Sequence, residues 1–170
     1  TFNVSVVDSA NTRNTTVSRT IRIDTTNPLV SYQGATESDG ANLTRSWVLV
    51  NVSVTEINEA NITFTLYNST GSYNVTTFTN AQRTINWTGL ADGIYTFNVS
   101  IVDGANTRNT TASRTIKVDT TNPLVSYQGA TEADGANISR SWVLVNASVT
   151  DVSEANITFT LYNSTGSYNV

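Results

Sequence analysis

Apolar and polar residues alternate with a period of two along much of the chain. Every second residue of Trp47–Thr55 is valine, and the segment Ile94–Asp103 repeats the pattern with aromatic and branched side chains. Successive side chains of a β-strand point to opposite faces, so this period predicts strands with one buried face. No segment shows a convincing helical period. We expect the following residues to face a core: Val48, Val50, Val52, Val54, Ile62, Phe64, Leu66, Tyr95, Phe97, Val99 and Ile101.

Seven strands are predicted within one stretch of about 95 residues. Turn signals separate several of them, at Asp39-Gly40, Ser69–Ser72, Asp92-Gly93 and Asp103–Asn106. Such short spacing between turns is typical of an antiparallel sandwich. The predicted strands are Leu29–Gln33, Trp47–Thr55, Asn61–Tyr67, Tyr73–Phe78, Arg83–Thr88, Ile94–Asp103 and Ala112–Val118.

The chain contains an internal duplication with a period of 95 residues. Thr1–Val75 aligns with Thr96–Val170 without gaps, and 63 of the 75 aligned residues are identical. The two copies must therefore share one fold. Residues 76–95 occur once, and adding 20 such residues to the 170 restores two whole periods, so we expect the chain to start and stop in mid-unit.

The only two prolines mark the predicted boundaries between units. Pro28 and Pro123 each end the sequence Asp-Thr-Thr-Asn-Pro. Proline lacks a backbone donor and holds the preceding residue extended, which suits a stiff connector between β units. We expect residues 1–27 to be the C-terminal strands of one repeat, 28–122 a complete repeat, and 123–170 the N-terminal strands of the next.

The repeat also carries a specific order of motifs. Leu-Ala-Asp-Gly-Ile-Tyr-Thr-Phe at residues 90–97 leads to a Val-Asp-Gly-Ala-Asn turn, a last strand and Asp-Thr-Thr-Asn-Pro. This order resembles the tandem immunoglobulin-like (Ig-like) repeats of bacterial and archaeal cell-surface proteins, over essentially the whole chain. The resemblance implies an all-β fold of tandem antiparallel β-sandwiches with about seven strands per repeat. Asn-Pro stands where Pro-Pro is usual, and such repeats build adhesins, S-layer components, stalks and filaments alike.

N-glycosylation acceptor sequences are the strongest functional signal. Chance placement of the 21 asparagines and 48 serines and threonines would give roughly six Asn-X-Ser/Thr sequons, and the chain has fourteen. The predicted glycosylation sites are Asn3, Asn14, Asn42, Asn51, Asn61, Asn68, Asn74, Asn86, Asn98, Asn109, Asn137, Asn146, Asn156 and Asn163.

The positions of these asparagines support the glycosylation hypothesis. Asn51, Asn61 and Asn98 alternate with inward residues, and the triplets at Asn42 and Asn137 differ at two positions yet both remain acceptors. Only 13% of the residues are charged, against about 25% in an ordinary domain, so hydrated glycans would explain solubility. The alternative is that a strand surface rich in Thr and Asn creates sequons by accident.

The composition excludes most catalytic machinery. Without Cys, His and Met the chain has no disulfides, no thiol or imidazole metal site and no Ser-His-Asp triad. A net charge of −4 argues against nucleic acid, and the longest apolar run, Trp47–Val50, predicts no membrane span in this segment. A narrow sandwich offers no obvious cleft for two glycosidase carboxylates, so we expect no enzyme. The single lysine, Lys117, is matched by Arg22, which excludes a required Lys-Asn isopeptide staple.

Two further groups of residues leave alternatives open. Trp47 and Trp142 are interpreted as core or core edge rather than a sugar-stacking platform, and Trp87, inside the Asn86 sequon, is expected to be more exposed. Carboxylates near loops and unit ends could bind calcium, as in some related repeats, although solvated side chains are favoured. These carboxylates are Asp8, Asp24, Glu37, Asp39, Glu56, Glu59, Asp103, Asp119, Glu132, Asp134, Asp151 and Glu154.

The sequence therefore predicts a structural protein. We expect a heavily N-glycosylated, extracellular Ig-like repeat protein at the cell surface that forms a filament, sheath or S-layer-type assembly, without cofactors other than glycans. The expected partner is the protein itself, as head-to-tail copies, either continuous or joined by strand exchange, with continuity favoured because 20 residues restore the period. The alternative is an adhesin stalk or carbohydrate-binding surface module.

Overall fold

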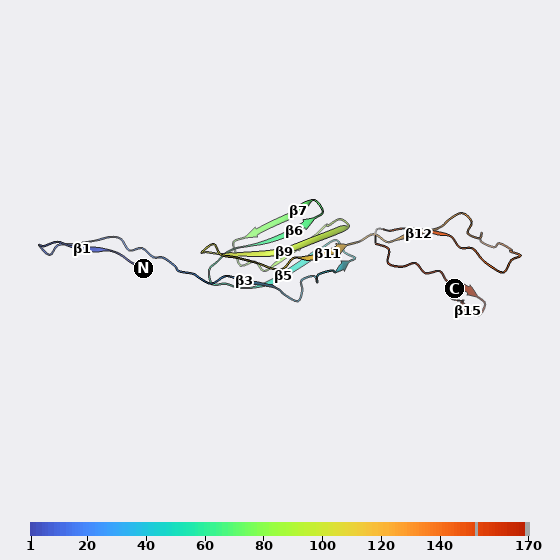
Figure 1. The fold of residues 1–170 in the computed structure, drawn as a ribbon, viewed down its shortest axis with the longest axis horizontal. Helices are drawn as coiled ribbons and strands as arrows, with labels where there is room; N and C mark the ends of the chain where they lie inside the picture. The colour runs from blue at the N-terminus through green and yellow to red at the C-terminus, as the bar shows by residue number, and fades with distance from the viewer. Residues whose placement is uncertain (152, 169–170) are drawn as a thin grey trace.

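Strands are the only regular elements in residues 1–151 and 153–168, the part of the chain that the structure describes. In this computed structural model an N-terminal hairpin, a central sandwich and a C-terminal group of strands follow one another along the long axis (Figure 1). No helix in the described residues has both the length and the apolar composition needed to cross a membrane.

Two sheets form the central sandwich. The smaller sheet has the strand order β3-β5-β8 and the larger has the order β4-β11-β9-β6-β7, with β10 also paired to β9. All of these pairs are antiparallel except β4 with β11. The strands are β3 (Leu29–Tyr32), β4 (Asn42–Leu43), β5 (Val48–Thr55), β6 (Glu59–Asn68), β7 (Gly71–Phe78), β8 (Thr84–Trp87), β9 (Gly93–Asp103), β10 (Arg108–Thr110) and β11 (Arg114–Val118).

The core lies between these two sheets and confirms the predicted alternation. Ten of the eleven residues expected to face inwards are buried, and Val54 is half-buried. Phe97 lies near the centre, with its ring 5.7 Å from Tyr32 in an edge-on contact and 6.3 Å from Trp87. The period of two therefore assigns the buried face of β5, β6 and β9 correctly.

All seven predicted strands are present, with ends within two residues of those expected. The sequence did not predict β4 and β10. These strands have two and three residues, which is too short for any alternation to be visible, and β10 is Arg-Asn-Thr. They form because longer strands, β11 and β9, offer free edges beside them.

Hydrogen bonds to Asp103, its first residue, stabilise the predicted turn after β9. Oδ1 of Asp103 accepts the backbone amides of Ala105 at 2.9 Å and Thr107 at 2.8 Å, and Asn106 has a φ of 67°. Asparagine tolerates this left-handed conformation because its short amide forms local hydrogen bonds. The N-terminal copy repeats the turn, with Asn11 at a φ of 66°.

The segments on either side of the sandwich form small sheets with exposed apolar residues. They are β1 (Ser5–Val7) with β2 (Arg13–Thr15), β12 (Leu124–Tyr127) with β13 (Ala147–Thr150), and β14 (Leu161–Asn163) with β15 (Gly166–Tyr168). Every buried residue of the described chain lies between Pro28 and Val118. The division into repeats at residues 27/28 and 122/123 stays a prediction.

Candidate functional site

The fourteen sequon asparagines are distributed over the surface. None is buried: Asn51, Asn61, Asn68, Asn98 and Asn109 are half-buried, and the other nine are exposed. Asn98 lies on β9 between Phe97 and Val99, whose side chains are both fully buried, so its amide is on the outer face. These positions leave room for a modification, and glycosylation itself stays a prediction.

In the sequon at the β6–β7 turn, the asparagine side chain is hydrogen-bonded to the threonine of the same sequon. Oδ1 of Asn68 accepts the hydroxyl of Thr70 at 2.7 Å and its backbone amide at 2.9 Å. Asn163 and Thr165 repeat both contacts at the same distances. The Asn-X-Thr unit is thus part of an Asx turn at an exposed tip, which is a position that tolerates a bulky group.

Two other sequon asparagines have structural contacts. Oδ1 of Asn74 accepts the indole N–H of Trp87 at 3.2 Å, and Nδ2 of Asn109 donates to the carbonyl of Pro28 at 2.9 Å. The second bond uses the atom that would carry a glycan. Asn109 is therefore the sequon asparagine whose modification would compete most directly with a contact of the sandwich.

The prediction that Trp87 is exposed is wrong. Its side chain is only 6% exposed, because Trp87 follows Ile85 on the inner face of β8 while Asn86 points outwards. Trp47 is 39% exposed and Trp142 is 58% exposed, so neither is a core residue. The parity of the strand explains this, because Trp47 is out of phase with the inward Val48.

Arginine side chains cover the two exposed indoles. The guanidinium carbon of Arg45 lies 4.1 Å from the ring centroid of Trp47, and that of Arg140 lies 4.0 Å from Trp142. These are cation–π contacts, which stabilise by roughly 0.5–1 kcal/mol at exposed positions. One face of each indole is therefore already in contact with a side chain.

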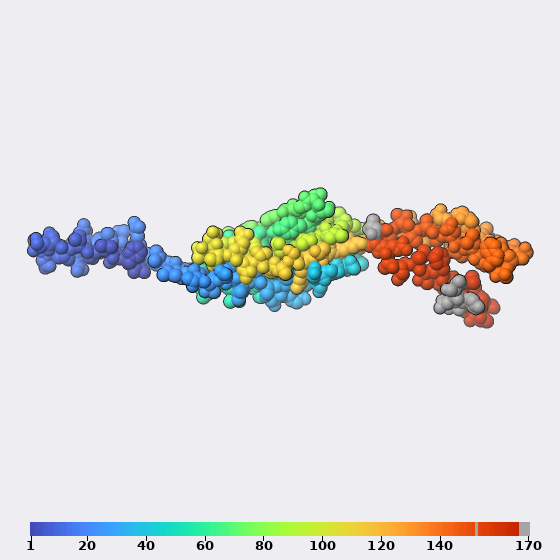
Figure 2. Space-filling model, in the orientation of Figure 1, coloured from blue at the N-terminus to red at the C-terminus, as the bar shows by residue number. Residues whose placement is uncertain are grey.

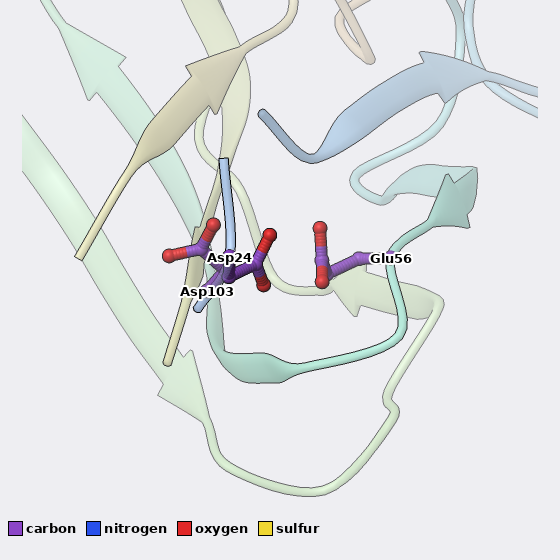
Figure 3. A group of neighbouring side chains, drawn as sticks. All are labelled: Asp24, Glu56 and Asp103. Atoms are coloured by element: carbon purple, nitrogen blue, oxygen red, sulfur yellow. The ribbon is translucent and has the colours of Figure 1, made fainter. Parts of the chain in front are cut away.

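Three carboxylates meet where the N-terminal segment joins the sandwich (Figure 3). Asp24 precedes β3, Glu56 follows β5, and Asp103 ends β9. Each offers an oxygen within 4.8 Å of the others, and Asp103 is buried while the other two are half-buried. The sequence named all three residues as possible calcium ligands and did not predict that they meet.

Hydrogen bonds engage each carboxylate of this cluster. The Thr107 hydroxyl, assisted by the backbone amides of its own turn, holds the pKa of Asp103 below its usual value. Asn58 connects the other two carboxylates, since its side-chain amide donates to Asp24 at 2.7 Å and its backbone amide to Glu56 at 2.6 Å. The cluster thus joins the N-terminal segment to the loop between β5 and β6.

The donor set of the cluster consists of hard oxygen atoms. Calcium takes six to eight such ligands, typically carboxylates and carbonyls, so the three carboxylates fit part of a calcium shell. Both oxygens of Asp103 already accept hydrogen bonds within their own turn. Calcium binding is the less favoured of the two alternatives that the sequence left open for these carboxylates, and it is untested for this chain.

Other acidic residues of the predicted set form ion pairs instead of being free in solvent. Glu37 pairs with Arg45, Glu59 with Arg83 and Glu132 with Arg140. The expectation of solvated carboxylates is wrong for these three. The two residues of each ion pair are at least eight positions apart in the sequence. No periodic pattern in the sequence indicated that they would be in contact.

The connector after the sandwich is fixed by its threonines. Oδ1 of Asp92 accepts the amide of Thr120 at 2.8 Å and its hydroxyl at 2.7 Å, and Oδ2 accepts the hydroxyl of Thr121 at 2.6 Å. The Thr121 hydroxyl, followed by that of Thr120, lowers the pKa of the Asp92 carboxyl. The Asp-Thr-Thr-Asn-Pro segment is therefore attached to the Asp92-Gly93 turn.

Part of the chain matches a known protein family. Residues 79–167, which are more than half of the chain, match the bacterial Ig-like domain (group 3). The chain belongs to this family. The match starts just before β8, crosses Pro123 and ends within β15.

Two solved structures are similar to the chain at low sequence identity. The fibronectin(III)-like modules of Clostridium thermocellum CbhA are 17% identical with a TM-score of 0.43, over 73% of this chain and 63% of that one. The dimeric latent PorU of Porphyromonas gingivalis is 12% identical with a TM-score of 0.39, over 68% of this chain and 12% of that one. The chain spans less than two thirds of either protein. No curated protein matches the sequence.

Proposed function

We propose that this chain is a structural segment of an extracellular, N-glycosylated array of Ig-like repeats that forms a filament, sheath or surface layer at the cell surface. The near-identity of its two copies carries the proposal, with 63 of 75 aligned residues the same. Identical neighbours meet through identical junctions, which is what a uniform rod requires. The partner of each repeat is then another copy of the repeat, arranged head to tail.

The geometry of the connector supports a stiff rod. Thr120 and Thr121 bind Asp92 of the preceding sandwich, and Pro123 restricts the chain directly afterwards. On the other side of the sandwich Asn58 ties Asp24 to the β5–β6 loop. Both connectors are thus attached to the sandwich between them, and the chain is elongated along one axis (Figure 2).

Glycans are the second part of the proposal. Fourteen sequons on exposed or half-buried positions accompany a charged fraction of only 13%. Hydrated sugars would solvate this surface where ionic groups are sparse. The role is structural, and no catalytic step is proposed for the carboxylates, which stabilise turns and connectors.

Two measurements on native material test this function. Peptide mass spectrometry should find most sequons occupied, and occupancy below about a third of the sites would contradict the glycan part of the proposal. Negative-stain imaging should show regular polymers. Separate monomeric beads that shift only when a ligand is added would instead support a binding module.

An adhesin stalk or carbohydrate-binding surface module is the second candidate function. The exposed indoles of Trp47 and Trp142 favour it, because aromatic rings stack on sugars, and Arg45 and Arg140 cover only one face of each. Titration of the chain with oligosaccharides, followed by tryptophan fluorescence, tests this candidate. A saturable change that Trp47→Ala removes would support it, and an unchanged spectrum would exclude it.

A further inference from the structure

The outer face of the smaller sheet places an exposed indole beside a glycosylation sequon. Strand β5 pairs with β8 so that Leu49 lies opposite Asn86, and Trp47 is two residues before Leu49 on the same face. Both Trp47 and Asn86 are on the outside, because Val48 and Trp87, which follow them, are buried. Trp47 and Asn86 are therefore diagonal neighbours, whose Cβ atoms are about 7–8 Å apart in an antiparallel pair, within reach of long side chains.

The side chain of Asn86 is available to carry a glycan. Asn86 is exposed, and so is Thr88, the third residue of its sequon. Within residues 1–151 and 153–168 the side-chain amide of Asn86 makes no hydrogen bond, in contrast to the side chains of Asn74 and Asn109. A glycan at this position would therefore break no contact of the sandwich, and it would extend over the outer face from the edge strand β8.

Arg45 covers the face of the Trp47 ring that is turned away from β8. Its guanidinium carbon lies 4.1 Å from the ring centroid, and it pairs with Glu37. The backbone amide of Glu37 donates to the carbonyl of Leu49 at 3.4 Å, which places Glu37 along the edge of β5 opposite the edge that pairs with β8. Arg45 therefore contacts the indole from the side away from Asn86, and Trp47 stays 39% exposed.

We propose that the glycan on Asn86 stacks one of its first pyranose rings on the open face of Trp47. This proposal rests on the glycosylation proposed above and specifies what one glycan contacts. The C–H face of a pyranose is apolar, and its burial against an aromatic ring removes apolar surface from water. Because the sugar is attached to the neighbouring strand, the contact is intramolecular and forms at a high effective concentration.

The stacked sugar adds a cross-strand contact at the edge of the smaller sheet. Strand β8 is the last strand in the order β3-β5-β8, and it contributes Trp87 to the core. A sugar that is attached to β8 and packs on β5 connects these strands on their outer face, as opposed side chains do. The contact also occupies the face of Trp47 that a sugar from outside the chain would need.

Fluorescence quenching by acrylamide tests the contact. In a Trp142→Phe background only two indoles remain, and Trp87 is 6% exposed and poorly accessible to a quencher, so quenching reports on Trp47. In natively glycosylated, full-length protein of this background, Thr88→Ala removes the sequon. We expect it to raise the quenching constant about twofold or more, since it uncovers the second face of the ring. Asn86→Gln should give the same increase through a different substitution.

A sequon on the other sheet supplies the matched control. Ser100→Ala removes the acceptor sequence of Asn98, which lies on the outer face of β9, and it should leave the quenching of Trp47 unchanged. NMR spectra distinguish stacking from simple shielding by the glycan. Ring currents should shift C–H protons of a sugar upfield, and Trp47→Leu should remove this shift while Asn86 stays occupied.

Peptide mass spectrometry of the same preparations separates the outcomes. A glycan at Asn86 combined with equal quenching in the Thr88→Ala protein, or with sugar shifts that survive Trp47→Leu, would overturn the stacking and leave the glycosylated array intact. An Asn86 without a glycan, in a chain whose other sequons are occupied, would also overturn the stacking alone. Unmodified asparagines at all fourteen sequons would overturn both the stacking and the glycan part of the proposed function.

Discussion

Two segments of nearly the same sequence have different structures in this chain. Residues 48–55 and 143–150 differ only at Val52, which is Ala147 in the second copy. The first segment is a strand over all eight residues, whereas the second is a strand only from Ala147 to Thr150. The side chains of Val143 and Val145 are exposed, and their counterparts Val48 and Val50 are fully buried.

The difference follows the available partners. Residues 48–51 pair with β8 and residues 52–55 pair with β3 in the central sandwich. Among the residues that the structure describes, the second segment pairs with β12, the counterpart of β3, and only the half beside β12 is a strand. Strand formation here depends on cross-strand pairing and burial more than on the intrinsic preference of the residues.

Local turns, unlike the strands, have the same structure in both copies of the sequence. Asp8 in the open hairpin accepts the amides of Ala10 and Thr12, both at 2.9 Å, as Asp103 does in the closed unit. A hydrogen bond from a threonine hydroxyl lowers the pKa of both carboxyls. The turn is therefore encoded by adjacent residues, whereas the sheet needs partners from elsewhere in the chain.

The largest effect should come from the aromatic residue at the centre of the closed core. Phe97→Ala should lower the free energy of unfolding of the central sandwich by about 3–5 kcal/mol, the usual cost of removing a buried phenylalanine side chain. Phe2→Ala, at the equivalent exposed position, should leave that free energy unchanged. Urea denaturation of the full chain measures both, and equal losses would contradict the distinction between closed and open units.

Tryptophan substitutions should show the same contrast at smaller amplitude. Trp87→Phe removes buried volume and the indole donor to Asn74, and we expect a loss of about 1–2 kcal/mol. Trp142→Phe changes an exposed ring and should leave the unfolding transition in place. Thermal unfolding followed by circular dichroism is the measurement, and an unaltered melting temperature for the Trp87 variant would argue against its burial.

The contact between Asn109 and Pro28 should contribute less. Asn109→Ala removes one hydrogen bond and should cost about 1 kcal/mol. Asn14→Ala, at the equivalent position of the open hairpin, should have no effect on the central unit. Calorimetry of unglycosylated protein separates this structural effect from any effect of a glycan.

The smallest effect at neutral pH should come from Asp103→Asn, and its pH dependence is the informative part. The lowered pKa of Asp103 stabilises the fold above the ordinary carboxyl pKa of about 3.9, and this contribution disappears as the pH falls through the lower folded pKa. The stabilities of wild type and variant should therefore converge in acid. Asp8→Asn, at the equivalent position of the N-terminal hairpin, is the control. A difference in stability between wild type and Asp103→Asn that stays constant from pH 7 to pH 2 would exclude the mechanism.

The sequence predicted the sandwich well because its long strands alternate regularly. The inward positions of β5, β6 and β9 followed from that period alone. Trp87 was placed incorrectly because its sequon was weighted above the alternation with Ile85, which would have indicated burial. Strands as short as β10 carry no period, and no local pattern could have shown them.

The junction contacts could not be predicted from the sequence. Asp24 precedes β3, Glu56 follows β5 and Asp103 ends β9, and their meeting depends on how the strands between them pack. The same holds for Asp92, whose contacts with Thr120 and Thr121 join positions 28 and 29 residues apart. Prolines indicated where the connectors are, whereas the hydrogen bonds that fix them required the fold.

Hydrogen exchange tests the central claim most directly, because the chain contains its own control. Peptides covering residues 47–55 and 142–150 are distinguishable by mass through Val52 and Ala147. In dilute, monomeric protein the backbone amides of residues 48–51 should exchange orders of magnitude more slowly than those of residues 143–146, because only the former pair with β8 in a closed core. Equal exchange in the two peptides would contradict the account that pairing and burial, more than the sequence of the segment, decide where a stable strand forms.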